Sequence, residues 1–133
     1  MIISNNINST NFNAKFFHSK GLEEVAKYAV EQNKFDRLDA ARKNINSTNL
    51  RTRLLFEYGK NEKGYPFISF TRFEPKSFVL VPQTMNDYNE FKPVIIEGAM
   101  KNQNPLAFAL KKLIAMGNSV PHNKIFKKVV LNK

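Results

Sequence analysis

The first third of the chain has the apolar pattern of a helix. Apolar side chains recur every three or four positions through residues 19–44, as they do along one face of an amphipathic helix. The pattern breaks near Asn33, and residues 44–49 (NINSTN) end it, because Asn, Ser and Thr side chains bond to nearby backbone groups and favour turns. The same hexamer stands at residues 6–11, and an aromatic, strand-like stretch follows it at residues 12–17.

The middle of the chain changes to a β pattern. Residues 50–58 and 65–74 are rich in aromatic and branched side chains, and a loop bounded by Gly59 and Gly64 separates them. Two such runs around a short glycine-containing loop predict a β-hairpin. Residues 76–81 (KSFVLV) form an apolar run set off by a proline on each side, which predicts a third strand.

The last part of the chain predicts two more helices and a final strand. Residues 85–91 place Met, Tyr and Phe side chains on one helical face, and Pro93 must end or kink that helix. Residues 104–118 predict a helix that starts with Asn and Pro and stops at Gly117. Residues 125–131 predict a short strand.

These elements follow the order β-α-β-β-β-α-α-β, which predicts an α+β fold. The length fits a single domain over residues 1–133, with a mainly antiparallel sheet whose central hairpin packs against the helices. Residues 1–11 are polar and are expected to form a flexible N-terminal segment. No apolar run reaches the roughly 18–20 residues of a membrane span, and the start of the chain lacks the pattern of a secretory signal.

Composition removes several classes of chemistry. The absence of cysteine excludes disulfides and Cys-based metal sites or nucleophiles, and a cytoplasmic location is expected. No Gly-rich phosphate loop and no metal-ligand cluster is present, so we expect no cofactor. His18 and His122 could form an acid–base pair of the ribonuclease type, although two unrelated surface histidines are the simpler interpretation. Abundant Asn, Lys, Ile and Phe indicate an AT-rich phage or bacterial source.

Positive charge is concentrated towards the C-terminus. Residues 1–100 carry 14 Lys and Arg against 11 Asp and Glu, a net charge of +3, whereas residues 101–133 carry seven Lys and no acidic residue. A one-sided basic segment is typical of proteins that bind nucleic acid or another polyanion. A solvated lysine-rich surface that aids solubility is the alternative interpretation.

The predicted hairpin offers aromatic and basic side chains on its strands. Because side chains alternate between faces, Arg51 and Arg53 share one face of residues 50–58, and the more apolar face should meet the helices. Rings beside arginines on an open sheet face could bind single-stranded nucleic acid, with bases stacked on the rings, unless these phenylalanines form the core. The residues expected to contact nucleic acid are Arg51, Arg53, Lys60, Lys63, Tyr65, Phe67, Arg72, Phe73, Lys76, Lys111, Lys112, Lys124, Lys127 and Lys128.

The hairpin, the stretch SFVLVP and the stretch QTMNDYNEF that follows it show a family resemblance. In element order, residues 50–100 resemble the single-stranded nucleic-acid-binding fold of the Whirly, Pur-alpha-like and positive-coactivator proteins. The resemblance implies a curved antiparallel sheet followed by a helix. It further implies strands that face the nucleic acid and homo-oligomers built through the helices.

The sequence therefore predicts a single-stranded nucleic-acid-binding protein that is not an enzyme, with DNA or RNA as its partner. An acidic protein surface is a further possible partner for the lysine-rich segment, and no membrane association is expected. The alternative is a phage-encoded protein-interaction module, either an inhibitor of a host system or a minor virion component. A nuclease that uses His18 or His122 is a third hypothesis.

Overall fold

A computed structural model describes residues 16–48, 51–118, 120 and 122–131. It confirms an α+β domain with an antiparallel sheet, and the segment expected to be flexible, residues 1–11, lies outside the described residues. The elements in chain order are α1 (Lys20–Glu31), α2 (Phe35–Asn46), β1 (Arg53–Lys60), β2 (Pro66–Pro75), η2 (Met85–Asp87), β3 (Tyr88–Glu90), β4 (Val94–Glu97), α3 (Pro105–Met116), α4 (Lys124–Phe126) and η3 (Lys127–Leu131).

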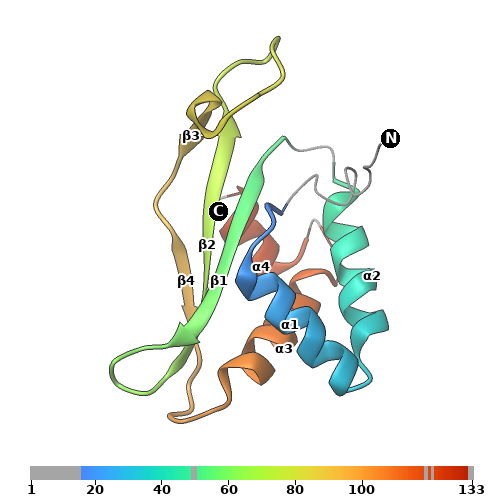
Figure 1. The fold of residues 1–133 in the computed structure, drawn as a ribbon, viewed down its shortest axis with the longest axis vertical. Coiled ribbons are helices and arrows are strands. Elements are labelled where there is room, and N and C mark those ends of the chain that lie inside the picture. Colours follow the sequence, from blue (N-terminus) through green and yellow to red (C-terminus); the bar gives the residue numbers. More distant parts are fainter. Residues whose placement is uncertain (1–15, 49–50, 119, 121, 132–133) are drawn as a thin grey trace.

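Strand β2 is the centre of the sheet. It pairs with β1 along one side as the predicted hairpin, and β3 and β4 share its other side, all antiparallel. β4 pairs with the first half of β2 and β3 with its last residues. Figure 1 shows the strands on one side of the molecule and the helices on the other, so the sheet has a covered face and an open face.

The covered face of β1 is the more apolar face that alternation predicted to meet the helices. Phe56 lies opposite Phe70, Tyr58 lies opposite Ile68, and the side chains of Phe56, Phe70 and Ile68 are at most 1% exposed. Helices α1 and α3 pack against these strands. Burying large apolar side chains between sheet and helices is the main favourable contribution to folding, so this layer is the core.

The helices begin and end at residues suited to those positions. Ser19 Oγ accepts from Leu22 N at the start of α1, and Asn104 Oδ1 accepts from Leu106 N at the start of α3. The predicted break near Asn33 separates α1 from α2, and Asn33 has a φ of 57°. Asn adopts this left-handed conformation more readily than most residues, so the chain can turn there.

The predicted strand at residues 76–81 is not formed. This segment is a bent loop between β2 and η2, in which Ser77 Oγ accepts from Val79 N and Leu80 N. A side chain that bonds to the backbone two and three residues ahead holds a turn, which competes with strand pairing. The apolar content of residues 76–81 was therefore not enough to make this segment a strand.

The predicted helix at residues 85–91 is reduced to the single turn η2. Asp87 carboxylate Oδ2 accepts from Gln83 N and Thr84 N, which closes a capping box around one turn. The chain then extends into β3 and β4, with Pro93 between them. Proline has no N–H and cannot continue a helix. The residues before and after Pro93 pair with β2 instead.

The predicted strand at residues 125–131 is helical instead. Asn123 Oδ1 accepts from Ile125 N and Phe126 N at the start of α4, and η3 continues from α4 as a further helical turn. Phe126, Val129 and Val130 are buried, and their spacing of three and four residues is that of a helix face.

At the other end of the chain, only two residues of the strand-like stretch 12–17 are described. Phe16 forms one isolated parallel bridge with Leu54, and residues 12–15 lie outside the described part. Across the described segments, no helix combines the length and the apolar character that crossing a membrane requires.

Candidate functional site

The hairpin residues expected to bind nucleic acid are divided between the two faces of the sheet. Arg53 lies opposite Phe73 on the open face, whereas Arg72 lies opposite Leu54, in the register of the covered face. The Arg72 guanidinium is 4.2 Å from the centroid of the Phe91 ring, and its Nε is 3.3 Å from a carboxylate oxygen of Glu74. Arg72 is therefore engaged inside the protein and does not join Arg53.

On the open face, the aromatic rings pack against one another. The Arg53 guanidinium is 4.1 Å from the centroid of the Phe17 ring. The Phe17 ring makes edge-to-face contacts with Phe73 at 5.4 Å and with Tyr88 at 5.6 Å. Phe73 is only 5% exposed. A base can stack only on a ring whose face is free, so this cluster is a packed patch of the sheet and not a stacking platform.

Carboxylates also occupy the open face. By strand register, Glu57 lies opposite Ser69, Glu90 opposite Phe73 and Glu97 opposite Phe67, and all three glutamates are exposed. Exposed carboxylates along this face oppose the approach of a phosphate backbone.

The other predicted residues of this region are spread around the sheet. Tyr65 and Phe67 are half-buried, and four exposed basic residues lie at the strand ends or in the adjoining loops. These four are Arg51, Lys60, Lys63 and Lys76. The structure does not gather the hairpin residues into one surface.

The predicted lysines of the C-terminal part lie on two helical segments that pack against each other. α3 carries Lys111 and Lys112, and it contacts α4, which together with η3 carries the other three lysines. The Asn123 side chain amide joins the segments by donating to Ala115 O at 2.5 Å and to Asn118 O at 2.9 Å. The buried apolar residues of α4 and η3 hold one side of this helical segment in the core, and the lysines lie on its other, exposed side.

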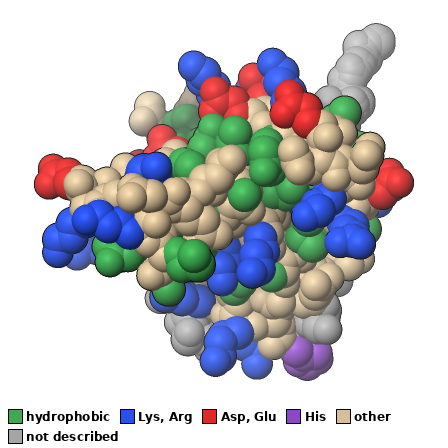
Figure 2. Space-filling model, turned by 90° about the horizontal axis from the view of Figure 1, so that it is seen from below, with side chains coloured by type: hydrophobic (Ala, Val, Ile, Leu, Met, Phe, Trp, Pro, Cys, Tyr) green, Lys and Arg blue, Asp and Glu red, His purple; other side chains and the backbone are tan. Residues whose placement is uncertain are grey.

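These lysines have no acidic partners among the described residues. Lys111, Lys124, Lys127 and Lys128 are exposed, and no ion pair in the described chain involves them. Lys112 is half-buried, with its ammonium 5.6 Å from the centroid of the Phe108 ring. In Figure 2, Lys and Arg side chains spread over the lower half of the view with no acidic side chain among them, and the acidic side chains lie along the upper edge and the sides.

An apolar cavity lies between α1, α2 and the chain that precedes α1. Its volume is about 470 Å³, within the range of roughly 300–1,000 Å³ that small-molecule sites occupy. Its apolar lining consists of Phe16, Phe17, Leu22, Ala26, Phe35, Leu38, Ala41, Ile45 and Leu113. The sequence pattern could not show this cavity, because it depends on how α1 and α2 pack.

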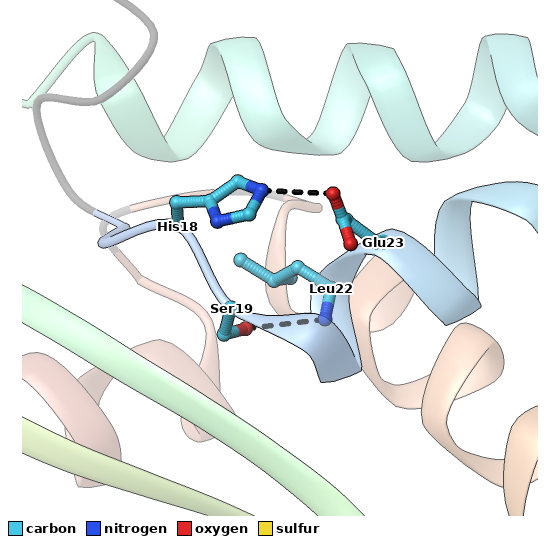
Figure 3. Close-up of polar contacts among 4 residues, drawn as sticks. All are labelled: His18, Ser19, Leu22 and Glu23. Carbon is cyan, nitrogen blue, oxygen red and sulfur yellow. Dashed lines mark hydrogen bonds and ion pairs between the residues drawn. The ribbon is translucent and has the colours of Figure 1, made fainter.

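A histidine–carboxylate pair stands at the rim of the cavity. His18 Nε2 lies 2.9 Å from Glu23 Oε2, with side chains that are 78% and 54% exposed. Figure 3 shows the two side chains pointing toward each other, and the Ser19 hydroxyl engaged with Leu22 N as the helix cap. No hydrogen bond or ion pair of the described chain joins His18 to His122. Among the described residues, no group of three or more His, Cys, Asp or Glu side chains could hold a metal ion.

The loop at residues 78–81 exposes four apolar side chains in a row. Phe78 is 94% exposed, Val79 88%, Leu80 71% and Val81 73%. Large contiguous apolar patches on a protein surface mark sites of interaction with another molecule. Sequence reasoning assigned this run to a strand, and Ser77 between the prolines is the signal that could have identified a turn.

The comparisons with known proteins add no relative to this picture. No family model and no curated protein matches the sequence, and no solved structure matches the fold. The resemblance to Whirly-type proteins stays a prediction, and the strand predicted at residues 76–81 and the helix predicted at residues 85–91, on which it was based, are not formed.

Proposed function

We propose that the protein binds nucleic acid through the lysines of α3, α4 and η3. The observation that supports this most directly is that Lys111, Lys124, Lys127 and Lys128 are exposed on adjoining helical segments without an acidic partner among the described residues. We call these four residues the lysine surface. The 33 residues from 101 to 133 contain no acidic residue that could neutralise it.

The physical basis of the binding is the phosphate backbone. Lysines that neutralise phosphates release condensed counterions, so affinity depends on salt and only weakly on sequence. The packed rings and the carboxylates of the open sheet face do not favour base stacking there. We therefore place the contact on the helical side of the molecule, and we expect comparable binding to single-stranded and duplex oligonucleotides.

Three charge-reversal variants of equal net charge test this assignment. The first changes Lys111, Lys127 and Lys128 to Glu, the second changes Arg51, Lys60 and Lys63 to Glu at the hairpin, and the third changes Lys27, Lys34 and Lys92 to Glu as a control elsewhere. All nine residues are exposed, and each variant lowers the formal net charge of +10 by six. Fluorescence anisotropy with labelled oligo(dT) and with a labelled duplex at low salt measures the affinity.

The lysine-surface variant should bind at least about tenfold more weakly than the control variant. If the hairpin variant loses more affinity than the lysine-surface variant, the nucleic acid lies on the sheet side instead. Equal losses in all three variants would mean that net charge alone attracts the oligonucleotide, and the proposal would then fail. No binding by the wild-type protein at low salt would also exclude it.

A further inference from the structure

We propose that the apolar loop at residues 78–81 of one copy inserts into the α1–α2 cavity of a second copy. The molecule carries an exposed apolar protrusion and, elsewhere on its surface, an apolar cavity. Insertion of the loop into the cavity would remove the apolar surface of both from water. This inference goes beyond nucleic-acid binding and does not depend on it.

The loop is held ready for insertion by bonds at its base. Ser77 Oγ accepts from Val79 N and Leu80 N, Arg51 donates to Ser77 O at 2.9 Å, and Lys76 N donates to Asp87 O at 2.9 Å. These bonds fix the backbone while the four apolar side chains stay in solvent. A loop that is already ordered loses less conformational entropy when it binds.

The cavity has the size and lining to receive such side chains. A cavity of roughly 150 Å³ lined by apolar groups holds a benzene molecule, so 470 Å³ has room for about three groups of that size. The cavity therefore has room for the side chains of Phe78 and Leu80, two alternate residues of the loop. Phe35, which is 43% exposed at the start of α2, extends the apolar lining towards the solvent.

The positions of the two features determine the kind of assembly. In Figure 1 the loop projects at the top of the molecule beyond the end of β2, whereas α1 and α2 lie on the right. The contact therefore joins two different surfaces and is head-to-tail. A heterologous contact of this kind continues from copy to copy, into a ring if the rotation closes and into a chain if it does not.

Charge favours a second copy over a lipid surface as the occupant. Two cationic residues, Arg51 and Lys76, stand beside the loop together with two carboxylates, those of Glu74 and Asp87. These charges balance, so the loop lacks the excess of Lys and Arg that draws a segment to an anionic membrane. At the cavity rim stands the Glu23 carboxylate, and the exposed Lys76 stands at the base of the loop. Insertion brings these opposite charges together, which supports the head-to-tail orientation.

Sedimentation velocity of the full chain tests self-association. A contact of this small size is weak, so the concentration should run from about 10 µM to about 1 mM. The weight-average mass of the wild-type protein should at least double from the 15.3 kDa of one copy across that range. The loop variant, Phe78→Asp with Leu80→Asp, and the cavity variant, Phe35→Asp, should stay at 15.3 kDa.

Mixing the two variants isolates the head-to-tail contact. The loop variant keeps an intact cavity and the cavity variant keeps an intact loop, so together they should form a one-to-one dimer that does not extend further. Ile95→Asp, which changes a 57% exposed apolar side chain on the open sheet face, is the control and should associate like the wild type. Circular dichroism confirms that each variant is folded.

Several results would overturn the proposal. One is a wild-type protein that stays monomeric at every concentration, and another is a mixture of the two variants that forms no dimer. A loss of association in Ile95→Asp would place the contact on the sheet face. Loop-dependent flotation of monomers with vesicles of phosphatidylcholine and phosphatidylserine would assign the loop to a lipid surface instead.

Discussion

The hydroxyl of Tyr58 donates a hydrogen bond to Glu24 Oε1 at 2.7 Å, and this bond joins β1 to α1 across 34 positions of the sequence. It lies at the edge of the core, where Gly21 of α1 approaches the Phe56 carbonyl oxygen closely enough that an added Cβ would lie 3.4 Å from it. Helix α1 is thus joined to the sheet by van der Waals contact at Gly21 and by one polar bond.

The first prediction concerns stability at high pH. Burial, and then the neighbouring Glu24 carboxylate, raise the pKa of Tyr58 from its ordinary 10.0 to about 12. The folded protein therefore holds the phenol proton more tightly than the unfolded chain does. The stabilisation is complete below about pH 10 and is lost as the pH rises towards 12, so the free energy of unfolding should fall across this window.

Urea unfolding at a series of pH values, compared between wild type and Tyr58→Phe, measures this effect. The variant should lack part of the fall between pH 10 and 12, and Tyr65→Phe in the hairpin should retain it. Identical pH profiles for wild type and Tyr58→Phe would contradict the role of Tyr58.

The second prediction concerns Gly117, the residue that ends α3. A Cβ added there would overlap both the Cβ and the backbone of Ala41 in α2. Because backbone atoms cannot move aside cheaply, Gly117→Ala should lower the free energy of unfolding by about 2 kcal/mol or more. Gly21→Ala is the matched control: its new Cβ meets only ordinary contacts of 3.4 Å or more, and its stability should be unchanged or slightly higher. Thermal unfolding of both variants measures the difference, and equal melting temperatures would show that α2 and α3 pack less closely.

The third prediction concerns Asn123. Its side chain accepts from two N–H groups at the start of α4 and donates to Ala115 O in the last turn of α3 and to Asn118 O just after that helix. Asn123→Ala removes all four bonds and should cost about 1–2 kcal/mol of unfolding free energy. Hydrogen exchange should show faster exchange in α4 and η3 than in the β1–β2 hairpin of the same variant. Uniformly unchanged exchange would mean that buried Phe126 and Val130 hold the segment without the cap.

Local sequence patterns predicted the elements whose contacts are mostly local. The helical spacing of residues 19–44, the caps of α3 and the glycine-bounded hairpin all lie within a few residues of the features that cause them. The failures depend on distant contacts or on competing side chains. Residues 125–131 carry branched residues typical of strands. They are nevertheless helical, and Phe126, Val129 and Val130 form the helix face that is buried in the core.

The candidate sites divide in the same way. The lysine-rich segment was visible as a charge pattern, because exposed lysines need no particular neighbours. Alternation predicted which face of β1 carries Arg53, but the register that places Arg72 on the other face and the packing of Phe17 against Phe73 became visible only in the structure. The cavity between α1 and α2 arises from the angle at which two helices meet, and no short stretch of sequence encodes that angle.

The most direct test of nucleic-acid binding through the lysine surface is the salt dependence of affinity. The logarithm of the affinity for oligo(dT) should fall linearly with the logarithm of the salt concentration. The steepness of this fall should decrease by about two when Lys111, Lys127 and Lys128 are changed to Glu, since each lost phosphate contact removes about 0.7 from the magnitude of the slope. The control with Lys27, Lys34 and Lys92 changed to Glu should keep the wild-type slope. A slope that is the same in both variants would contradict the proposed contact.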